Sequence, residues 1–376
     1  MTKFKVLSLL CLVILLFSGG CSNPTAFYKP STQVDNLDVT ERSVKKETIT
    51  PLQKAKEAIV LLSASPNTDP LNPDTSRNSL CTGISINELG HILTNFHCIY
   101  QQKVIKLIYY SEDDYEFHDV KIIGTDPLAD LALLEVVSDM KPKYHIDMAD
   151  APEDIAEGDE VFALGHPMGM AWTLTKGIVS SNERYSRHPY IKTIQTDAAI
   201  NKGNSGGPLL NSKFELVGIN TFIISRVLEN AGVGLAVRGD VVKKSIERML
   251  LYGTVDRPAI GVMIHGLTNS QSRDKIIKEF PQRKQKYIPN TLGLYVKPGP
   301  NMPEGIQAHD TIIGVEGVLI NDGLQFSDEL GKYNVGDTIS LMIIRRRVFK
   351  ETVVTLIPLP INVQELYNQM RPAQVP

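Results

Sequence analysis

A serine within a glycine-rich run is the clearest chemical signal in this sequence. Residues 203–208 read Gly-Asn-Ser-Gly-Gly-Pro, with the serine at Ser205. Glycine permits tight turns with positive φ, and such turns can aim successive backbone N–H groups at one point. The run therefore predicts a turn able to form an oxyanion hole around Ser205.

Two upstream segments supply the partners that a serine nucleophile needs. The hydroxyl is a poor nucleophile until a base takes its proton, and a carboxylate must hold that base in the right tautomer. His97 ends a hydrophobic strand-like run, and Asp130 precedes another at residues 131–134. His97, Asp130 and Ser205, separated by 33 and 75 residues, are therefore our candidate triad.

Chain order decides between two folds that could carry this serine. The spacing Gly-x-Ser-x-Gly also fits the nucleophile elbow of an esterase-like acyl hydrolase, whose histidine follows the serine. Only His265 and His309 lie after Ser205, and both fall in a predicted second domain. The order histidine, aspartate, serine instead favours the chymotrypsin-like double barrel.

The elements expected around these residues are mostly strands. Short β-branched runs separated by turn residues recur from Ala55 to Val237, which indicates an antiparallel barrel or sandwich. The first strong helical pattern covers residues 241–251, with Asp240 as its expected N-cap and Gly253 as its stop. We place the domain boundary just after this helix.

Four motifs together resemble the HtrA/Deg family of trypsin-like serine proteases. They are Thr94-Asn95-x-His97, Asp130-Leu131-Ala132-Leu133-Leu134, Gln195-Thr196-Asp197-Ala198-Ala199-Ile200-Asn201 and Gly203-Asn204-Ser205-Gly206-Gly207-Pro208. The resemblance covers roughly residues 51–360. It implies a mainly β chain with a chymotrypsin-like double β-barrel protease domain at 51–254, a smaller α+β PDZ-like domain at 255–360 and a tail at 361–376.

The resemblance also implies a role for each candidate residue. Ser205 would be the nucleophile, His97 the general base and then acid, and Asp130 the group that stabilises the imidazolium, while the Gly203 and Ser205 amides would form the oxyanion hole. Loops that misplace such amides can switch a family member off. The matching loops here are Gly165–Gly169, Glu183–Arg187 and Ile223–Val227.

Substrate preference follows from the residue six positions before the nucleophile. In chymotrypsin-like enzymes this residue forms the floor of the primary specificity pocket, and an aspartate there selects Lys or Arg. Here the position is Ala199, followed by Ile200. A substrate cation would be left unpaired in such a pocket, so we expect cleavage after Val, Ala, Ile or Leu.

Cys81 and Cys98 match the disulfide that lies beside the histidine in the chymotrypsin superfamily. Most HtrA proteins lack cysteines at these positions, so the pair is a departure toward the wider superfamily. A disulfide fits an oxidising compartment. Two buried reduced thiols are the alternative.

The C-terminal module resembles an HtrA-type PDZ domain. The amides near Ile260, Gly261 and Val262 would receive a peptide's C-terminal carboxylate while the peptide adds as a strand to the sheet edge. His309 stands where a glycine is usual in the family. The alternative is a degenerate PDZ domain that only packs on the protease.

The N-terminus has the layout of a secretory signal peptide at residues 1–20. Lys3 and Lys5 precede the apolar run 6–17, which would span only about 18 Å as a helix, and small residues lead to Cys21. Cys21 resembles a lipoprotein acylation site, which would anchor the chain in a membrane facing the periplasm or exterior through a flexible tether at 21–50. Ser18 stands where such sites usually carry Leu, so cleavage without lipidation, giving a soluble secreted or periplasmic protein, stays the alternative.

Composition narrows the class of function further. The chain has 376 residues, 42% of them hydrophobic, and a net charge of −3, which excludes a disordered chain and argues against a nucleic-acid partner. The catalytic segments carry no metal-ligand spacing and the sequence has no phosphate-binding loop, so we expect no metal, nucleotide or other cofactor.

These features together predict an ATP-independent serine endopeptidase of the cell envelope that cleaves misfolded or regulatory proteins. A chaperone or scaffold that binds unfolded clients, with proteolysis secondary or silent, is the second hypothesis. A homotrimer formed through the N-terminal segment, with Phe27 and Tyr28 contributing, is expected by family analogy alone.

Overall fold

The computed structural model describes residues 49–65, 79–110, 115–139, 141–166, 172–185, 188–201, 203–221, 232–279 and 288–370. The chain divides into two compact units, 1–48 and 49–376, and all described residues belong to the second unit. The predicted signal peptide, Cys21 and the tether as far as residue 48 lie outside the described residues. So do residues 167–169 and 186–187 of two predicted loops and the whole of the third, 223–227.

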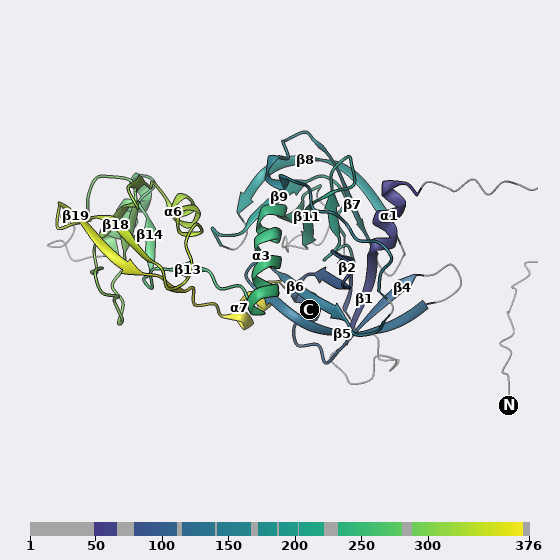
Figure 1. The fold of residues 1–376 in the computed structure, drawn as a ribbon. Helices are drawn as coiled ribbons and strands as arrows, with labels where there is room; N and C mark the ends of the chain where they lie inside the picture. The colour runs from purple at the N-terminus through teal and green to yellow at the C-terminus, as the bar shows by residue number, and fades with distance from the viewer. Residues whose placement is uncertain are drawn as a thin grey trace, which may run out of the picture. The chain divides into compact units, whose positions relative to one another are not determined.

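Six strands close the first barrel (Figure 1). They are β1 (Ile59–Ser65), β2 (Ser79–Ser85), β3 (His91–Thr94), β4 (Val104–Tyr110), β5 (Tyr115–Asp126) and β6 (Leu131–Val136). Their order is β1-β2-β3-β6-β5-β4, with antiparallel pairs throughout and closure between β4 and β1. Helix α1 (Pro51–Ala58) leads into β1, and its first turn has a capping box formed by Thr50 and Gln53.

A second barrel repeats this arrangement in the order β10-β11-β12-β9-β8-β7. Its strands are β7 (Glu160–Gly165), β8 (Thr173–Tyr185), β9 (Lys192–Thr196), β10 (Pro208–Leu210), β11 (Leu216–Thr221) and β12 (Gly234–Arg238). A single 3-10 turn, η2 (Pro152–Asp154), precedes β7. The expected chymotrypsin-like double barrel, in a mainly β chain, is therefore confirmed.

Both faces of the central strands are buried, which explains their nearly continuous apolar runs. Successive residues of a strand point to opposite faces. On β3, Ile92 packs in the interior of the first barrel, while Leu93 packs in a second cluster with Leu164 and Leu216 of the other barrel. This shared cluster joins the two barrels, and the candidate triad residues come from loops beside it.

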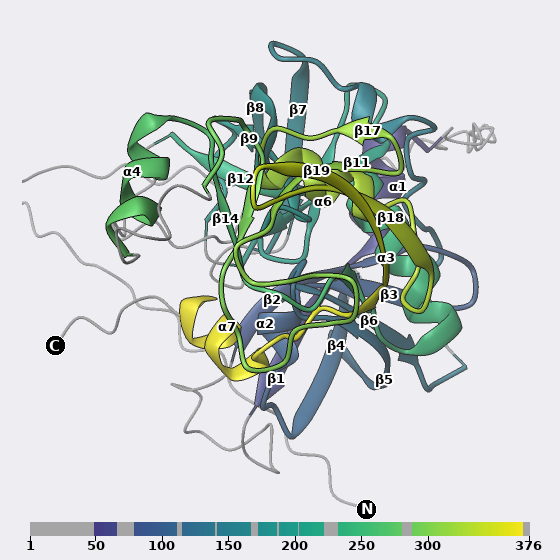
Figure 2. The same ribbon diagram turned by 90° about the vertical axis from the view of Figure 1, so that its left-hand side faces the viewer.

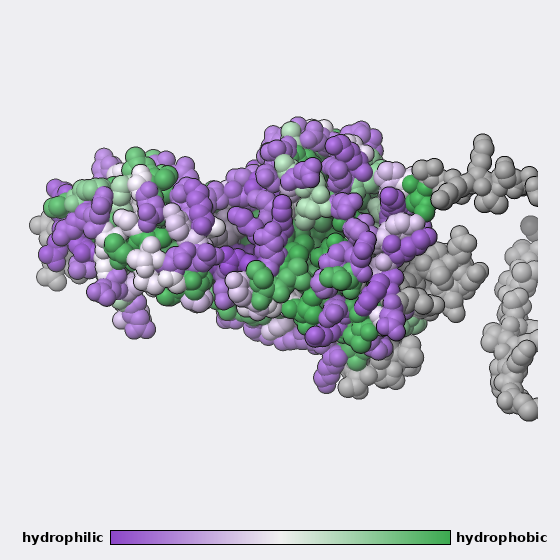
Figure 3. Space-filling model, viewed as in Figure 1, coloured by the Kyte–Doolittle hydropathy of each residue, from purple (hydrophilic) through white to green (hydrophobic). Residues whose placement is uncertain are grey.

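Helix α3 (Gly239–Tyr252) follows the second barrel and packs against β5. It ends at Gly253, whose left-handed backbone caps the helix as expected. The predicted N-cap is wrong, because Arg238 occupies that position and Asp240 lies in the first turn, where its carboxylate accepts hydrogen bonds from the Arg238 guanidinium at 2.8 Å. At the other end of α3, Leu250, Leu251 and Tyr252 are exposed, and Figure 3 shows apolar residues gathered over this part of the protease domain.

The residues after α3, called the C-terminal domain below, form a separate sheet with its own cluster of buried apolar residues. Its sheet has the order β14-β15-β16-β18-β19, with β17 beside β16, and a separate pair joins β13 to β20. The strands are β13 (Pro258–Ala259), β14 (Ile264–Gly266), β15 (Leu294–Val296), β16 (Thr311–Val315), β17 (Val318–Leu319), β18 (Thr338–Arg345), β19 (Val348–Thr355) and β20 (Ile357–Pro358). Helices α4 (Ser270–Glu279) and α6 (Gly323–Leu330) accompany the sheet.

The segment predicted as a tail contains helix α7 (Val363–Met370), which packs on the first barrel. Tyr367 is buried, and its ring meets that of Tyr100 edge-on at a centroid distance of 4.5 Å. Figure 2 shows α7 beside α2 (Phe96–Ile99), the short helix that Tyr100 caps. Among the described residues no helix combines the length and apolar character required to cross a membrane.

Candidate active site

His97 and Asp130 come from the same edge of two neighbouring strands. Strand β3 pairs antiparallel with β6, with Thr94 opposite Ala132, so the residues after β3 lie beside those that precede β6. The Asp130 carbonyl accepts hydrogen bonds from the backbone N–H of Phe96 at 3.0 Å and from the Asn95 side chain at 2.9 Å. These bonds hold α2, and His97 within it, against the start of β6.

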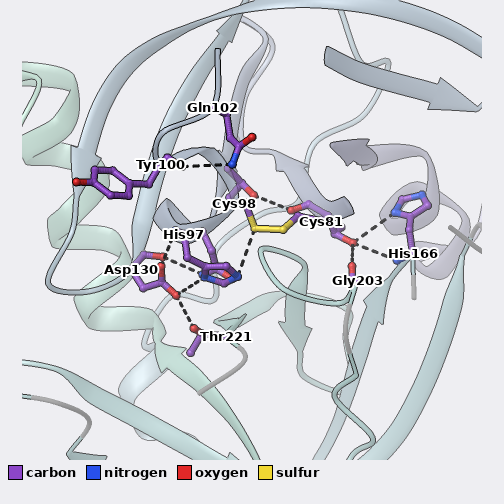
Figure 4. The surroundings of a disulfide bond; sticks show 12 residues. Cys81, His97, Cys98, Tyr100, Gln102, Asp130, His166, Gly203 and Thr221 are labelled. Atoms are coloured by element: carbon purple, nitrogen blue, oxygen red, sulfur yellow. Dashed lines mark hydrogen bonds and ion pairs between the residues drawn. A yellow bond between two sulfur atoms is a disulfide. The ribbon is translucent and has the colours of Figure 1, made fainter. Parts of the chain in front are cut away.

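The carboxylate of Asp130 holds the imidazole of His97 (Figure 4). Oδ2 lies 2.8 Å from Nδ1 of His97, and Oδ1 accepts the His97 backbone N–H at 2.9 Å. The Thr221 hydroxyl, on β11 of the second barrel, donates to Oδ2 at 2.7 Å. A carboxylate only accepts, so the ring proton belongs on Nδ1 and Nε2 is left to act as a base.

The turn that carries Asp130 is itself anchored by a buried ion pair. Asp126 is fully buried, and its carboxylate accepts two hydrogen bonds from the Arg257 guanidinium, each 2.7 Å long. The same carboxylate accepts the Ser245 hydroxyl at 2.7 Å and the Ala129 N–H at 3.1 Å. Breaking a buried pair costs about 3–5 kcal/mol, so this anchor resists movement of Asp130.

Ser205 lies in a tight loop directly before β10. The Gly206 N–H donates to the Asn220 carbonyl, and the Gly207 N–H donates to the Asn204 carbonyl, both at 2.9 Å. Gly206 has a φ of 82°, and a Cβ there would lie 2.2 Å from the Thr82 carbonyl oxygen. Glycine is therefore required at this position for both its conformation and its size.

Two backbone N–H groups of the loop remain available for a ligand. Within the described residues, neither the Gly203 nor the Ser205 N–H donates a hydrogen bond, whereas the intervening Asn204 N–H donates to the Asn201 carbonyl at 3.0 Å. Gly203 has a φ of 105°, which glycine adopts readily. Two free N–H donors, one from Ser205 itself and one from Gly203 two residues before it, are the arrangement that an oxyanion hole requires.

His97 does not contact the Ser205 hydroxyl in this structure. Among the described residues there is no hydrogen bond between His97 Nε2 and Ser205 Oγ, and Nε2 lies 3.6 Å from Cys98 Sγ. Such contacts are often long without substrate and shorten when it binds.

A disulfide joins Cys81 of β2 to Cys98 of α2 beside the imidazole (Figure 4). Cys81, His97 and Cys98 bring three atoms of metal-ligating type within 4.8 Å of one another. Both sulfurs are used in the disulfide, so neither is a thiolate that could hold a metal. The bond instead ties the histidine helix to the barrel wall.

Ala199 and Ile200 lie between β9 and the nucleophile loop. The Ala199 carbonyl accepts the Thr175 hydroxyl at 3.0 Å, and Ile200 is buried. A Cβ on Gly234 of β12 would lie 2.8 Å from the Ile200 side chain, so the wall opposite Ile200 is packed closely. The nearby Asp197 carboxylate is engaged by the Ile178 N–H at 2.7 Å.

In the C-terminal domain, the segment 260–262 connects β13 to β14. Ile260 is buried, Gly261 has a φ of 73°, and β14 forms an edge of the sheet. His309, where the family favours glycine, has a φ of 74°, and its Nδ1 lies 2.5 Å from the Tyr295 hydroxyl. A left-handed backbone favours glycine, which explains why glycine is the expected residue at this position. In this chain the imidazole of His309 instead contacts the Tyr295 hydroxyl.

Sequence reasoning missed the residues that orient the site from a distance. Thr221 and Arg257 lie 91 and 131 positions from the carboxylates that they contact. His166 is buried beside Thr82, and burial lowers its pKa to about 4. No local pattern marks Thr82, Thr221 or Arg257.

Comparison with known proteins agrees with the geometry. Residues 81–219 match the family model of the trypsin-like peptidase domain. The matched segment runs from β2 in the first barrel to β11 in the second.

Named relatives carry the same type of domain. The chain is 34% identical over 273 residues to the periplasmic serine endoprotease DegP of Escherichia coli K12, covering 71% of this chain and 54% of that protein. It is 31% identical over 280 residues to a probable periplasmic DegP-like serine endoprotease of Brucella suis, covering 74% and 52%. The solved HtrA-type protease AlgW with a tripeptide is 25% identical, with a TM-score of 0.67, and the match covers 83% of this chain and 97% of that one.

The chain thus spans about half the length of the DegP relatives that it matches. The similarities are to proteins described as DegP serine endoproteases and as an HtrA-type protease. They concern the domain and its fold, and they assign no role to any individual residue of this chain.

Proposed function

We propose that this protein is an ATP-independent serine endopeptidase of the cell envelope that cleaves misfolded or regulatory proteins. One observation carries the proposal: a buried Asp130 carboxylate paired with His97, and Ser205 in a loop where its own N–H and that of Gly203 are free, lie within the segment that matches a trypsin-like peptidase domain. The relatives' description as periplasmic endoproteases supports the class of substrate and the location.

The reaction proceeds by acyl transfer. As Ser205 Oγ attacks the carbonyl carbon of the scissile bond, His97 Nε2 takes its proton, and the N–H groups of Gly203 and Ser205 bind the resulting oxyanion. His97 then gives the proton to the leaving amine, and the C–N bond breaks to leave an acyl-enzyme. Water, deprotonated by His97, hydrolyses the ester and restores Ser205. Asp130 stabilises the imidazolium in both halves.

We assign the primary specificity pocket to Ala199 and Ile200. Neither side chain can pair with a cation, and Ile200 is packed against β12. Cleavage of a peptide library should therefore occur after Val, Ala, Ile or Leu. A library cut chiefly after Lys or Arg would refute this assignment.

Degradation of unfolded casein tests the activity itself. The wild-type chain should degrade it without ATP, and Ser205→Ala should abolish degradation. Ser212→Ala is the matched control, because Ser212 is an exposed serine in the turn between β10 and β11. Equal rates for the wild type and Ser205→Ala would overturn the proposal. If neither chain degrades casein and both suppress its aggregation, the chaperone hypothesis replaces it.

We propose in addition that the C-terminal domain is PDZ-like and binds peptide C-termini through the segment 260–262. The positive φ of Gly261 and the edge position of β14 support a carboxylate-binding turn beside an open strand. Binding of a fluorescent peptide series should be lost when its terminal carboxylate is amidated. Undiminished binding of the amidated peptides would leave the domain as a packing module.

Lipidation of Cys21 and a homotrimeric state complete the proposal. Mass spectrometry of the mature N-terminus should find diacylglyceryl-modified Cys21, and an unmodified N-terminus would favour the soluble periplasmic form. Light scattering should report a trimer for the chain that retains the tether at residues 21–50. It should report a monomer for a chain that lacks these residues. A trimer from both would exclude the N-terminal segment as the assembly element.

A further inference from the structure

We propose that Thr82 is a positioning residue that holds the oxyanion hole open by tying the nucleophile loop of the second barrel to the first. The inference rests on the proposed function, because it concerns the same N–H groups of Gly203 and Ser205. Thr82 lies on β2 next to Cys81 and is completely buried. No sequence motif identified it.

Thr82 makes two hydrogen bonds to the nucleophile loop, and both reach carbonyl groups. Its hydroxyl donates to the Gly203 carbonyl at 2.7 Å, and its backbone N–H donates to the Ser205 carbonyl at 2.8 Å. Within the described residues, the Thr82 hydroxyl is the only hydrogen-bond donor to the Gly203 carbonyl. One residue of the first barrel therefore clamps the two residues whose N–H groups would bind the oxyanion.

The clamp matters because peptide units are planar. When the carbonyl of a unit is held, the N–H on its other side is held as well. Thr82 fixes the unit after Gly203 and the unit after Ser205, while the Gly207 N–H fixes the Asn204 carbonyl between them. The Gly203 N–H belongs to the preceding unit, so Thr82 acts on it through the φ and ψ of Gly203, which glycine leaves soft. Without the hydroxyl, the bond from the Asn204 N–H to the Asn201 carbonyl is the one remaining hydrogen bond within the described residues that holds the unit after Gly203. Rotation about φ and ψ would turn the Gly203 N–H away from the hole.

The surroundings of the Thr82 hydroxyl fix the direction in which it donates. Its oxygen accepts the His166 backbone N–H at 3.1 Å and lies 3.4 Å from His166 Nδ1. Figure 4 shows His166 and Gly203 beside each other on the side of Cys81 away from His97. The Gly203 carbonyl is the nearer of the two possible acceptors, at 2.7 Å from the hydroxyl against 3.4 Å for Nδ1. The hydroxyl proton is thus left for Gly203.

Replacing the hydroxyl by a methyl group tests the proposal while keeping the shape. Thr82→Val should lower kcat about 100-fold and leave KM within about twofold, since the loss of one oxyanion donor costs on the order of 10²–10³ in turnover. Affinity for a peptide boronate, whose tetrahedral oxygen occupies the hole, should fall by a similar factor. Thr82→Ser keeps the hydroxyl and should restore both quantities.

Thr352→Val is the matched control, because the Thr352 hydroxyl also donates to a glycine carbonyl, that of Gly305, at 2.8 Å in the C-terminal domain. It should retain wild-type kcat and boronate affinity. Thr82→Ala replaces Thr82→Val if the latter does not fold. Wild-type kcat in the hydroxyl-free variant, or a loss of kcat with unchanged boronate affinity, would overturn the inference. If the Ser205→Ala variant keeps wild-type activity, the proposed function itself is overturned instead.

Discussion

The two barrels position their candidate site residues by different kinds of contact. In the first barrel, His97 and Asp130 are fixed by the pairing of two adjacent strands, by hydrogen bonds between their own loops and by a disulfide. In the second barrel, Ser205 lies in a loop whose clamp, Thr82, comes from the first barrel. The comparison indicates that His97 and Asp130 are organised within one barrel, whereas the proposed oxyanion hole depends on contacts between both barrels.

The site residues of the first barrel also depend on the second barrel, but more weakly. Thr221 of the second barrel contributes one hydrogen bond to an Asp130 carboxylate that already accepts two from His97. The shared apolar cluster, which includes Leu93, Leu133, Leu164 and Leu216, holds the barrels together at this seam. Substitutions that remove contacts within the first barrel should therefore impair the function of His97 more than substitutions in the second barrel.

Substituting Asp130 and Thr221 separately tests this asymmetry and should give the largest effect. Asp130→Asn should lower kcat by about 10³–10⁴, because an amide no longer enforces the Nδ1–H tautomer of His97. Thr221→Val should lower kcat only about 10-fold, since the carboxylate keeps its two bonds to His97. Steady-state kinetics with a chromogenic peptide measures both. If Thr221→Val is as damaging as Asp130→Asn, the base is not organised within the first barrel alone.

Removing the disulfide should have the next largest effect, and on stability. Cys81 and Cys98 are 17 positions apart, so their bond contributes about 3 kcal/mol to the free energy of unfolding in the chain-entropy model. The double variant Cys81→Ala, Cys98→Ala should unfold at a lower urea concentration than the wild type. A dithiol reductant should destabilise the wild type and leave the double variant unchanged. Equal unfolding midpoints for both chains would show that strand pairing suffices to hold α2.

The last predicted effect concerns His166 in the second barrel, and it is negligible at neutral pH and develops only in acid. Burial lowers its pKa from 6.5 to about 4, so the unfolded chain binds the proton more readily between these values. Stability should therefore be lost as the pH falls from about 6.5 to about 4, by about 3 kcal/mol for this residue. Urea unfolding at several pH values measures the loss, and His166→Gln should reduce it. The rest of the slope would come from groups such as His188, whose pKa burial also lowers to about 4.

Local chemistry could be predicted from the sequence because it depends on neighbouring residues. The glycine run fixes the type of turn around Ser205, and the apolar runs before His97 and after Asp130 predict strands that present both residues at one edge. The order of the three residues then selects the double barrel. The chain end was harder to predict: the segment expected as a tail contains α7, whose Tyr367 is buried against Tyr100.

By itself, the sequence determined which residue types stand at which spacing, and with them the mainly β fold, the double barrel and the three candidates for chemistry. Only the tertiary structure decided what orients these candidates. Thr82 meets Gly203 across 121 positions, and Arg257 meets Asp126 across 131. Such pairs form only after the barrels close and pack together, because hydrogen bonds between distant segments depend on the closed geometry and leave no periodic signal in the chain.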